Sequence, residues 1–158
     1  MPTLAASTML LASALVLATP AAARQPPIGT LTFSQTTFGP LALSSYTFGL
    51  SNPTVDSTGG SGAGKVTFSD FTLVRSVDAA SPALMLLAAQ GRHVQRVVIS
   101  VANGDTPVTY TLEDVTVTSL RQSGATETTE TLTLAFRRIT MTVGGSSATW
   151  DLATNTSV

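Results

Sequence analysis

Residues Ser76 to Ser100 read SVDAASPALMLLAAQGRHVQRVVIS, and this segment carries the strongest structural signal in the chain. Its middle predicts one short helix, because Ser81 is suited to accept a hydrogen bond from the first free helical amides and Pro82 suits the first helical position. Gly91 favours a left-handed helix end. The residues that follow are rich in β-branched side chains, so a strand is expected there. The segment therefore predicts a single apolar helix set among strands.

Three long segments change the face on which their apolar residues lie. Alternation puts the apolar side chains of 108–112 on one face and those of 115–117 on the other, and segments 65–75 and 132–143 show the same change. A change of phase in a two-residue period requires an extra residue, so a β-bulge bends the strand there. Bent strands of this kind suit a small, tightly curved sheet. We predict a mainly β protein, a small bulged antiparallel β-barrel with one short α-helix.

Two glycine-containing turns complete the expected order of strands. The Asn-Gly-Asp sequence at 103–105 predicts a turn at the end of the strand that follows the helix. The glycine pair at 144–145 predicts a final hairpin, which would bring residues 148–152, including Trp150, onto the edge of the preceding strand.

Composition sets independent bounds on function. The 158 residues suffice for one domain with a substantial core. Charged residues make up 11% and the formal net charge is −1, so there is no basic surplus for nucleic acid. The chain has no cysteine and a single histidine, which excludes disulfides, thiolate metal sites and a His-based metal cluster. We expect no cofactor.

The first residues predict an export signal. Residues 9–18 form an apolar core that is too short for a membrane span, and three alanines follow at 21–23. We expect cleavage before Arg24, which would make residues 1–23 a signal peptide and 24–158 one mature domain, periplasmic or secreted and without a membrane span. The segment before the apolar core has no Lys or Arg. A mis-assigned start or a disordered Ala-rich arm is the alternative.

The segment around the helix resembles the Hcp family, the tube proteins of bacterial type VI secretion. The family pattern D-x-A-S-P-x-L, then G-[KR]-H-[IV], stands here at 78–84 and 91–94, and the strand pattern Y-x-L-E-D-V-x-V-x-S stands at 110–119. The resemblance covers about residues 28–143. The motif residues that we carry over are Asp78, Ser81, Pro82, Leu84, Gly91, His93, Glu113 and Asp114.

The resemblance implies a structural role. In this family six copies form a ring by pairing their barrel edges, rings stack into tubes, and effector proteins lie in the lumen. A loop in the family extends to the next ring, and the Gly-rich loop between the second and third expected strands corresponds to it. The candidate stacking residues are Asn52, Pro53, Val55, Asp56 and Gly64. A plain solvent-exposed loop is an equally good reading of this segment.

No catalytic constellation is evident, so we expect no enzyme. A Ser-His-Asp site around His93 would need partners that a sequence cannot place, although Ser81, Asp70 and Asp78 are available. The resemblance gives His93 a place in the fold, at the entry to a strand. A structural role for His93 is therefore the preferred interpretation.

Two other motifs are weaker candidates for chemistry. Glu113 and Asp114 are adjacent in a strand, so we expect their side chains on opposite faces, unlike a cooperating acid pair. At a bulge they are better suited to turn or interface hydrogen bonds. Residues 59–65 partly match a phosphate-binding loop, but Val66 replaces the magnesium-binding hydroxyl residue and a strand follows instead of a helix.

Three functions remain open. The first is an exported Hcp-like subunit that assembles into hexameric rings. The second is a true type VI inner-tube protein, which requires the leader to be an artefact, and the absence of methionine between Met9 and Met85 counts against this. The third is an exported monomeric binding module, with Trp150, Tyr46 and Tyr110 as candidate aromatic contacts.

Overall fold

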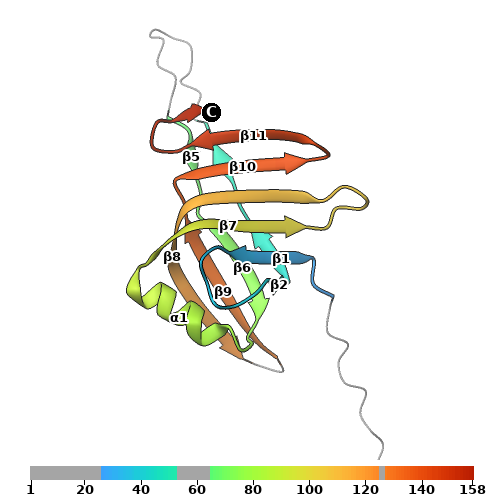
Figure 1. Ribbon diagram of the computed structural model, residues 1–158, viewed down its shortest axis with the longest axis vertical. Helices are drawn as coiled ribbons and strands as arrows, with labels where there is room; N and C mark the ends of the chain where they lie inside the picture. The colour runs from blue at the N-terminus through green and yellow to red at the C-terminus, as the bar shows by residue number, and fades with distance from the viewer. Residues whose placement is uncertain (1–25, 53–64, 125–126) are drawn as a thin grey trace, which may run out of the picture.

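The computed structural model describes residues 26–52, 65–124 and 127–158. These residues form one helix among short and long strands (Figure 1). The elements are β1 Gly29–Phe33, β2 Leu41–Leu43, β3 Ser45–Thr47, β4 Leu50–Ser51, β5 Thr67–Phe68, β6 Phe71–Ser76, α1 Ser81–Gln90, β7 His93–Val101, β8 Val108–Gly124, β9 Thr128–Ala135, β10 Arg138–Val143, β11 Ser146–Asp151 and β12 Thr156–Ser157. The helix α1, with 10 residues, is too short to cross a membrane.

Antiparallel strand pairs form a closed circuit. The long strand β8 pairs with β7 and with β9, β7 pairs with β1, and β9 pairs with β6. The circuit closes through residues 41–47, because β2 pairs with β1 while β3 pairs with β6. Between these two strands Ser44 donates its N–H to the carbonyl oxygen of Val74 at 2.8 Å. The predicted small antiparallel β-barrel with one helix is confirmed.

The long strand β8 changes phase where the sequence predicts. Leu112 and Val115 are both fully buried, and Asp114 between them has a φ of 53°. A residue in this left-handed region reverses the alternation of faces, so the strand bends. The register against β9 shifts again between Val117 and Ser119. These two irregularities let one strand curve around the barrel.

The other two predicted bulges are breaks between strands. Residues 65–75 form β5 and β6, separated at Ser69, whose N–H donates to the carbonyl oxygen of Gly49 at 2.9 Å. Residues 132–143 divide into β9 and β10. The register against β8 nevertheless continues across this break, since Ala135 pairs with Thr116 and Arg138 with Glu113. The interruption therefore lies opposite the bend in β8.

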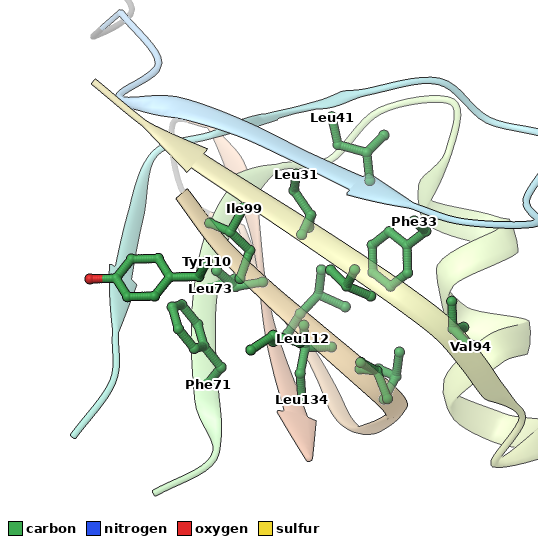
Figure 2. Close-up of a cluster of buried hydrophobic side chains, with 14 of the residues drawn as sticks. Leu31, Phe33, Leu41, Phe71, Leu73, Val94, Ile99, Tyr110, Leu112 and Leu134 are labelled. Carbon is green, nitrogen blue, oxygen red and sulfur yellow. The ribbon is translucent and has the colours of Figure 1, made fainter. Parts of the chain in front are cut away.

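The helix closes the lower end of the barrel through its apolar face. Leu84 and Leu87 are buried, whereas Met85 and Leu86 are about half exposed. Gly91 has a φ of 58° and donates its N–H to the carbonyl oxygen of Ala88, which confirms the predicted left-handed helix end. Figure 2 shows the core inside the barrel. Its fully buried apolar members are Leu31, Leu43, Phe71, Leu73, Leu84, Val97, Ile99, Leu112, Val115, Leu132 and Leu134.

The predicted final hairpin is confirmed. Gly144 and Gly145 both have positive φ, as a two-residue turn requires, and β11 pairs with β10 along its whole length. Trp150 lies opposite Ile139 and packs against Phe68 with ring centroids 6.3 Å apart. β12 pairs with the last two residues of β11, and Val158 donates its N–H to the carbonyl oxygen of Thr149, so the segment 146–148 is an open edge among the described residues.

Candidate functional site

A buried ion pair lies next to the connection between β6 and α1. Arg75 and Glu130 are 1% and 0% exposed, and they bond to each other across the paired strands β6 and β9. Arg75 also bonds to Asp78, and Gln122 donates to Glu130 at 3.2 Å. Sequence reasoning missed this pair because charged residues in strands are usually assigned to the outer face. The alternation of faces along the strand could have indicated it, because Arg75 follows Phe71 and Leu73 at every second position, which faces inward.

Asp78 and Ser81 fold the connection before the helix, but not as predicted. The Asp78 carboxylate accepts the N–H of Ala80 at 2.8 Å, and the Ser81 hydroxyl accepts the N–H of Asp78 at 3.1 Å. The predicted role of Ser81 as the helix cap is therefore wrong: Ala80 is the cap residue and makes no side-chain capping bond. Ser81 is the first helical residue, so its hydroxyl points back to the connection. Pro82 lies in the first turn, but as the second helical residue and not the first as predicted.

The bend in β8 brings His93 and both acidic motif residues onto the outer surface. Nδ1 of His93 lies 2.7 Å from Oδ1 of Asp114, and the two side chains are 70% and 52% exposed. Glu113 and Asp114 line the same surface pocket, so the expectation of opposite faces is wrong. The physical reason is the left-handed conformation of Asp114, which puts Leu112 and Val115 inside and leaves both acidic residues outside.

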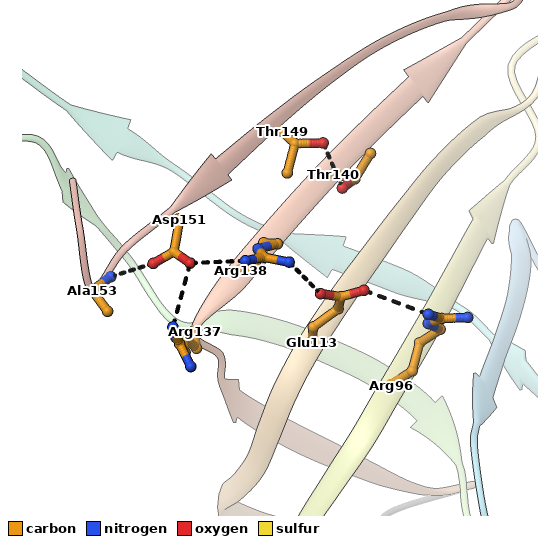
Figure 3. A network of polar contacts seen from close by, with 8 residues as sticks. All are labelled: Arg96, Glu113, Arg137, Arg138, Thr140, Thr149, Asp151 and Ala153. Carbon is orange, nitrogen blue, oxygen red and sulfur yellow. Dashed lines mark hydrogen bonds and ion pairs between the residues drawn. The ribbon is translucent and has the colours of Figure 1, made fainter. Parts of the chain in front are cut away.

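A row of alternating charges crosses four neighbouring strands at the level of this bend (Figure 3). Arg138 on β10 donates to Glu113 on β8 and to Asp151 on β11, both at 3.1 Å. Arg96 lies 3.5 Å from Glu113, and Arg137 lies 3.7 Å from Asp151. Arg138 is therefore the central link of the row, and it attaches the final hairpin to the barrel.

Asp151 should make stability depend on pH. The backbone N–H of Thr154 lowers the pKa of Asp151 below its ordinary 3.8, helped by Arg138 and the N–H of Ala153, and these effects outweigh burial. A carboxyl group whose pKa is lower in the folded state than in the unfolded state stabilises the fold at pH values above the unfolded pKa. This stabilisation is lost as the pH falls from the unfolded pKa through the lower, folded pKa. The urea midpoint should therefore drop between about pH 5 and pH 3.

Asp151→Asn should flatten this drop, because the amide keeps an acceptor oxygen but does not titrate. Glu127→Gln, at an exposed position, is the matched control and should leave the pH profile as in the parent protein. Urea unfolding at several pH values measures the effect. Equal slopes for the parent protein and Asp151→Asn would contradict this assignment.

The candidate catalytic residues do not come together in the described part of the chain. The hydrogen bond of His93 goes to Asp114 and that of Ser81 to Asp78, so no triad joins them in the described part of the chain. No group of three metal-ligating side chains occurs there either. Of the candidate stacking residues, Asn52 is exposed, and Pro53, Val55, Asp56 and Gly64 lie outside the described residues.

The candidate aromatic contacts face one another. Tyr46 and Tyr110 approach with their hydroxyls 3.4 Å apart, and burial, with a smaller effect from Tyr46, raises the pKa of Tyr110 to about 12. Both rings pack on Phe71, and Trp150 packs on Phe68. These aromatic rings therefore pack on core phenylalanines, as in an internal cluster.

Sequence comparison adds a match with a known family. The family described as "Type VI secretion system effector, Hcp" matches residues 34–143, which include the helix, both motif segments and the bend of β8. The chain belongs to the Hcp family. No curated protein sequence matches it significantly. The strands β11 and β12 follow the matched Hcp region.

Solved Hcp structures share the fold. Hcp1 from Salmonella typhimurium has a TM-score of 0.65 at 20% identity, covering 82% of this chain and 97% of its own. Hcp3 from Pseudomonas aeruginosa has a TM-score of 0.59 at 16% identity, covering 78% and 96%. Another solved structure, of a type six secretion system protein, has a TM-score of 0.69 at 20% identity, covering 82% of this chain and 98% of its own. The Hcp fold is therefore retained at low sequence identity.

Proposed function

We propose that the chain is an exported structural subunit that assembles into hexameric rings, which stack into tubes and can hold secreted effector proteins in the lumen. The observation that carries the proposal is the family match over 34–143. The leader supports export, since residues 9–18 form a short apolar core and three alanines follow at 21–23. Contacts between copies and cargo would be broad surface contacts, with no bond-making chemistry.

The open edge of β11 supports assembly. Residues Ser146–Ala148 have unpaired backbone groups on their outer side among the described residues, and they include no proline and no charged side chain. An edge of this kind is a template for another strand unless it is blocked. Repeated head-to-tail contacts between copies close into a ring when the rotation allows.

Ser147→Pro should reduce the assembly to single copies. In a two-residue hairpin the pair next to the turn is hydrogen-bonded, here Val143 with Ser146, and the bonding alternates along the strands. The N–H of Ser147 therefore points away from β10, and proline there removes only the outward donor. Light scattering on residues 24–158 measures the mass.

Ser147→Thr is the matched control, because it keeps the backbone donor, and it should retain the mass of six copies. An unchanged mass for Ser147→Pro would show that the β11 edge takes no part in the ring. A single-copy mass for the control and the parent protein would contradict the ring itself and favour a monomeric binding module.

A further inference from the structure

A pocket lies beside the charge row at the bend of the barrel. It has a volume of about 350 Å³ and is lined by Gln95, Arg96, Glu113, Asp114 and Arg137. Its two arginines are each 55% exposed and come from β7 and from the break between β9 and β10. A pocket with arginines on both sides can receive a carboxylate between them.

The two arginines keep most of their donors available. In the described part of the chain, Arg96 reaches Glu113 only at 3.5 Å and Arg137 reaches Asp151 only at 3.7 Å. Arg138 makes the shorter contacts with both carboxylates, at 3.1 Å. Each guanidinium has five N–H donors, so Arg96 and Arg137 can bind a further acceptor. Asp114 and Glu113 in the lining both oppose an incoming carboxylate, but Oδ1 of Asp114 is engaged by His93 and Oε2 of Glu113 by Arg138.

A carboxylate suited to this pocket lies at the other end of the same strand pair. Asp105 is exposed in the turn between β7 and β8, and no side-chain bond of its carboxylate occurs within the described residues. Arg96 is near the start of β7, and seven residues of extended chain separate it from the turn, roughly 20 Å. Figure 1 shows the turn and the start of β7 at opposite ends of the β7–β8 pair.

We propose that Asp105 of one copy binds between Arg96 and Arg137 of the next copy. A group at one end of a strand pair that fits a pocket at the other end joins copies head to tail, and each copy then supplies one donor and one acceptor surface. This inference rests on the proposed ring and identifies the surfaces that meet in it. Glu127 is also exposed, but it lies beyond the end of β8 at the far end of the barrel.

Cross-linking tests this contact directly, because the chain has no cysteine of its own. Gln95→Cys and Ala102→Cys introduce thiols beside the pocket and beside the turn while all the charges stay in place. The double variant, treated with a short bis-maleimide, should give covalent species up to six copies on a denaturing gel. Each single variant should remain one copy, since its thiols would not meet.

Charge reversal then separates this contact from others. In the double-cysteine background Asp105→Arg should lower the yield of cross-linked species about tenfold, the factor that corresponds to about 1.4 kcal/mol. Glu127→Arg makes the same change of charge elsewhere and should leave the yield unchanged. If the protein assembles but does not cross-link, or cross-links equally with Asp105→Arg, the inferred contact is wrong. The proposed ring would not be affected by that result. A single-copy mass in light scattering would overturn both.

Discussion

Glu130→Ala is expected to lower the free energy of unfolding by about 3–5 kcal/mol, because it leaves the Arg75 guanidinium buried without its main counter-charge. Arg75 is 1% exposed and its Nε already has no hydrogen-bond partner among the described residues. The contact with Asp78 would remain, but that carboxylate is 48% exposed and compensates the buried charge only in part. Urea unfolding of the purified domain measures the change.

Replacing both charges is the matched control. Arg75→Met combined with Glu130→Leu keeps the volume approximately and removes both charges, so it should cost far less than Glu130→Ala alone. A loss below about 1 kcal/mol for Glu130→Ala would place the pair among ordinary surface ion pairs and contradict its burial.

Gly29→Ala should destabilise the barrel by about 3 kcal/mol or more, at the strong end of what overpacking causes. A Cβ atom at Gly29 would overlap with the carbonyl oxygen of Ser100 and come within 2.9 Å of Cα of Val101. These are backbone atoms of the paired strand β7, so no side-chain rotation relieves the clash. The strand β1 would have to leave β7, and this opens the circuit of pairs that closes the barrel.

Gly39→Ala provides the control for this prediction. A Cβ atom at Gly39 would meet nothing within 4 Å, so the change should alter stability by less than about 0.5 kcal/mol. Thermal and urea unfolding of the two variants, with hydrogen exchange on β1 amides, check the result. Equal stabilities would show that β1 is not held against β7 as closely as the structure requires.

Much of the fold was predictable because its signals are local. The helix end at Gly91 follows from conformational preference, and the bend in β8 follows from the phase change between Leu112 and Val115. In the sequence, the breaks near Ser69 and Arg137 cannot be told from bulges, since a break and a bulge both shift the alternation of apolar residues by one position. Whether a strand bends or ends depends on its neighbours, which a single sequence does not specify.

The charged features were harder to predict, because partners far apart in the chain decide them. The bond between Arg75 and Glu130 spans 55 positions, and Arg138 acts through Glu113, 25 positions away. The hydroxyl of Ser81 accepts the N–H of Asp78 and not a free amide of the helix, because Ala80 occupies the cap position in place of Ser81. The left-handed Asp114 put both acidic residues outside, a result that strict alternation cannot give.

The most direct test of the account is negative-stain microscopy of residues 24–158, combined with light scattering on the same sample. We expect rings of six barrels with a central opening and a mass of six copies. Single barrel-sized particles with a one-copy mass at high concentration would contradict the proposed assembly, and the Hcp fold would then be retained without its ring.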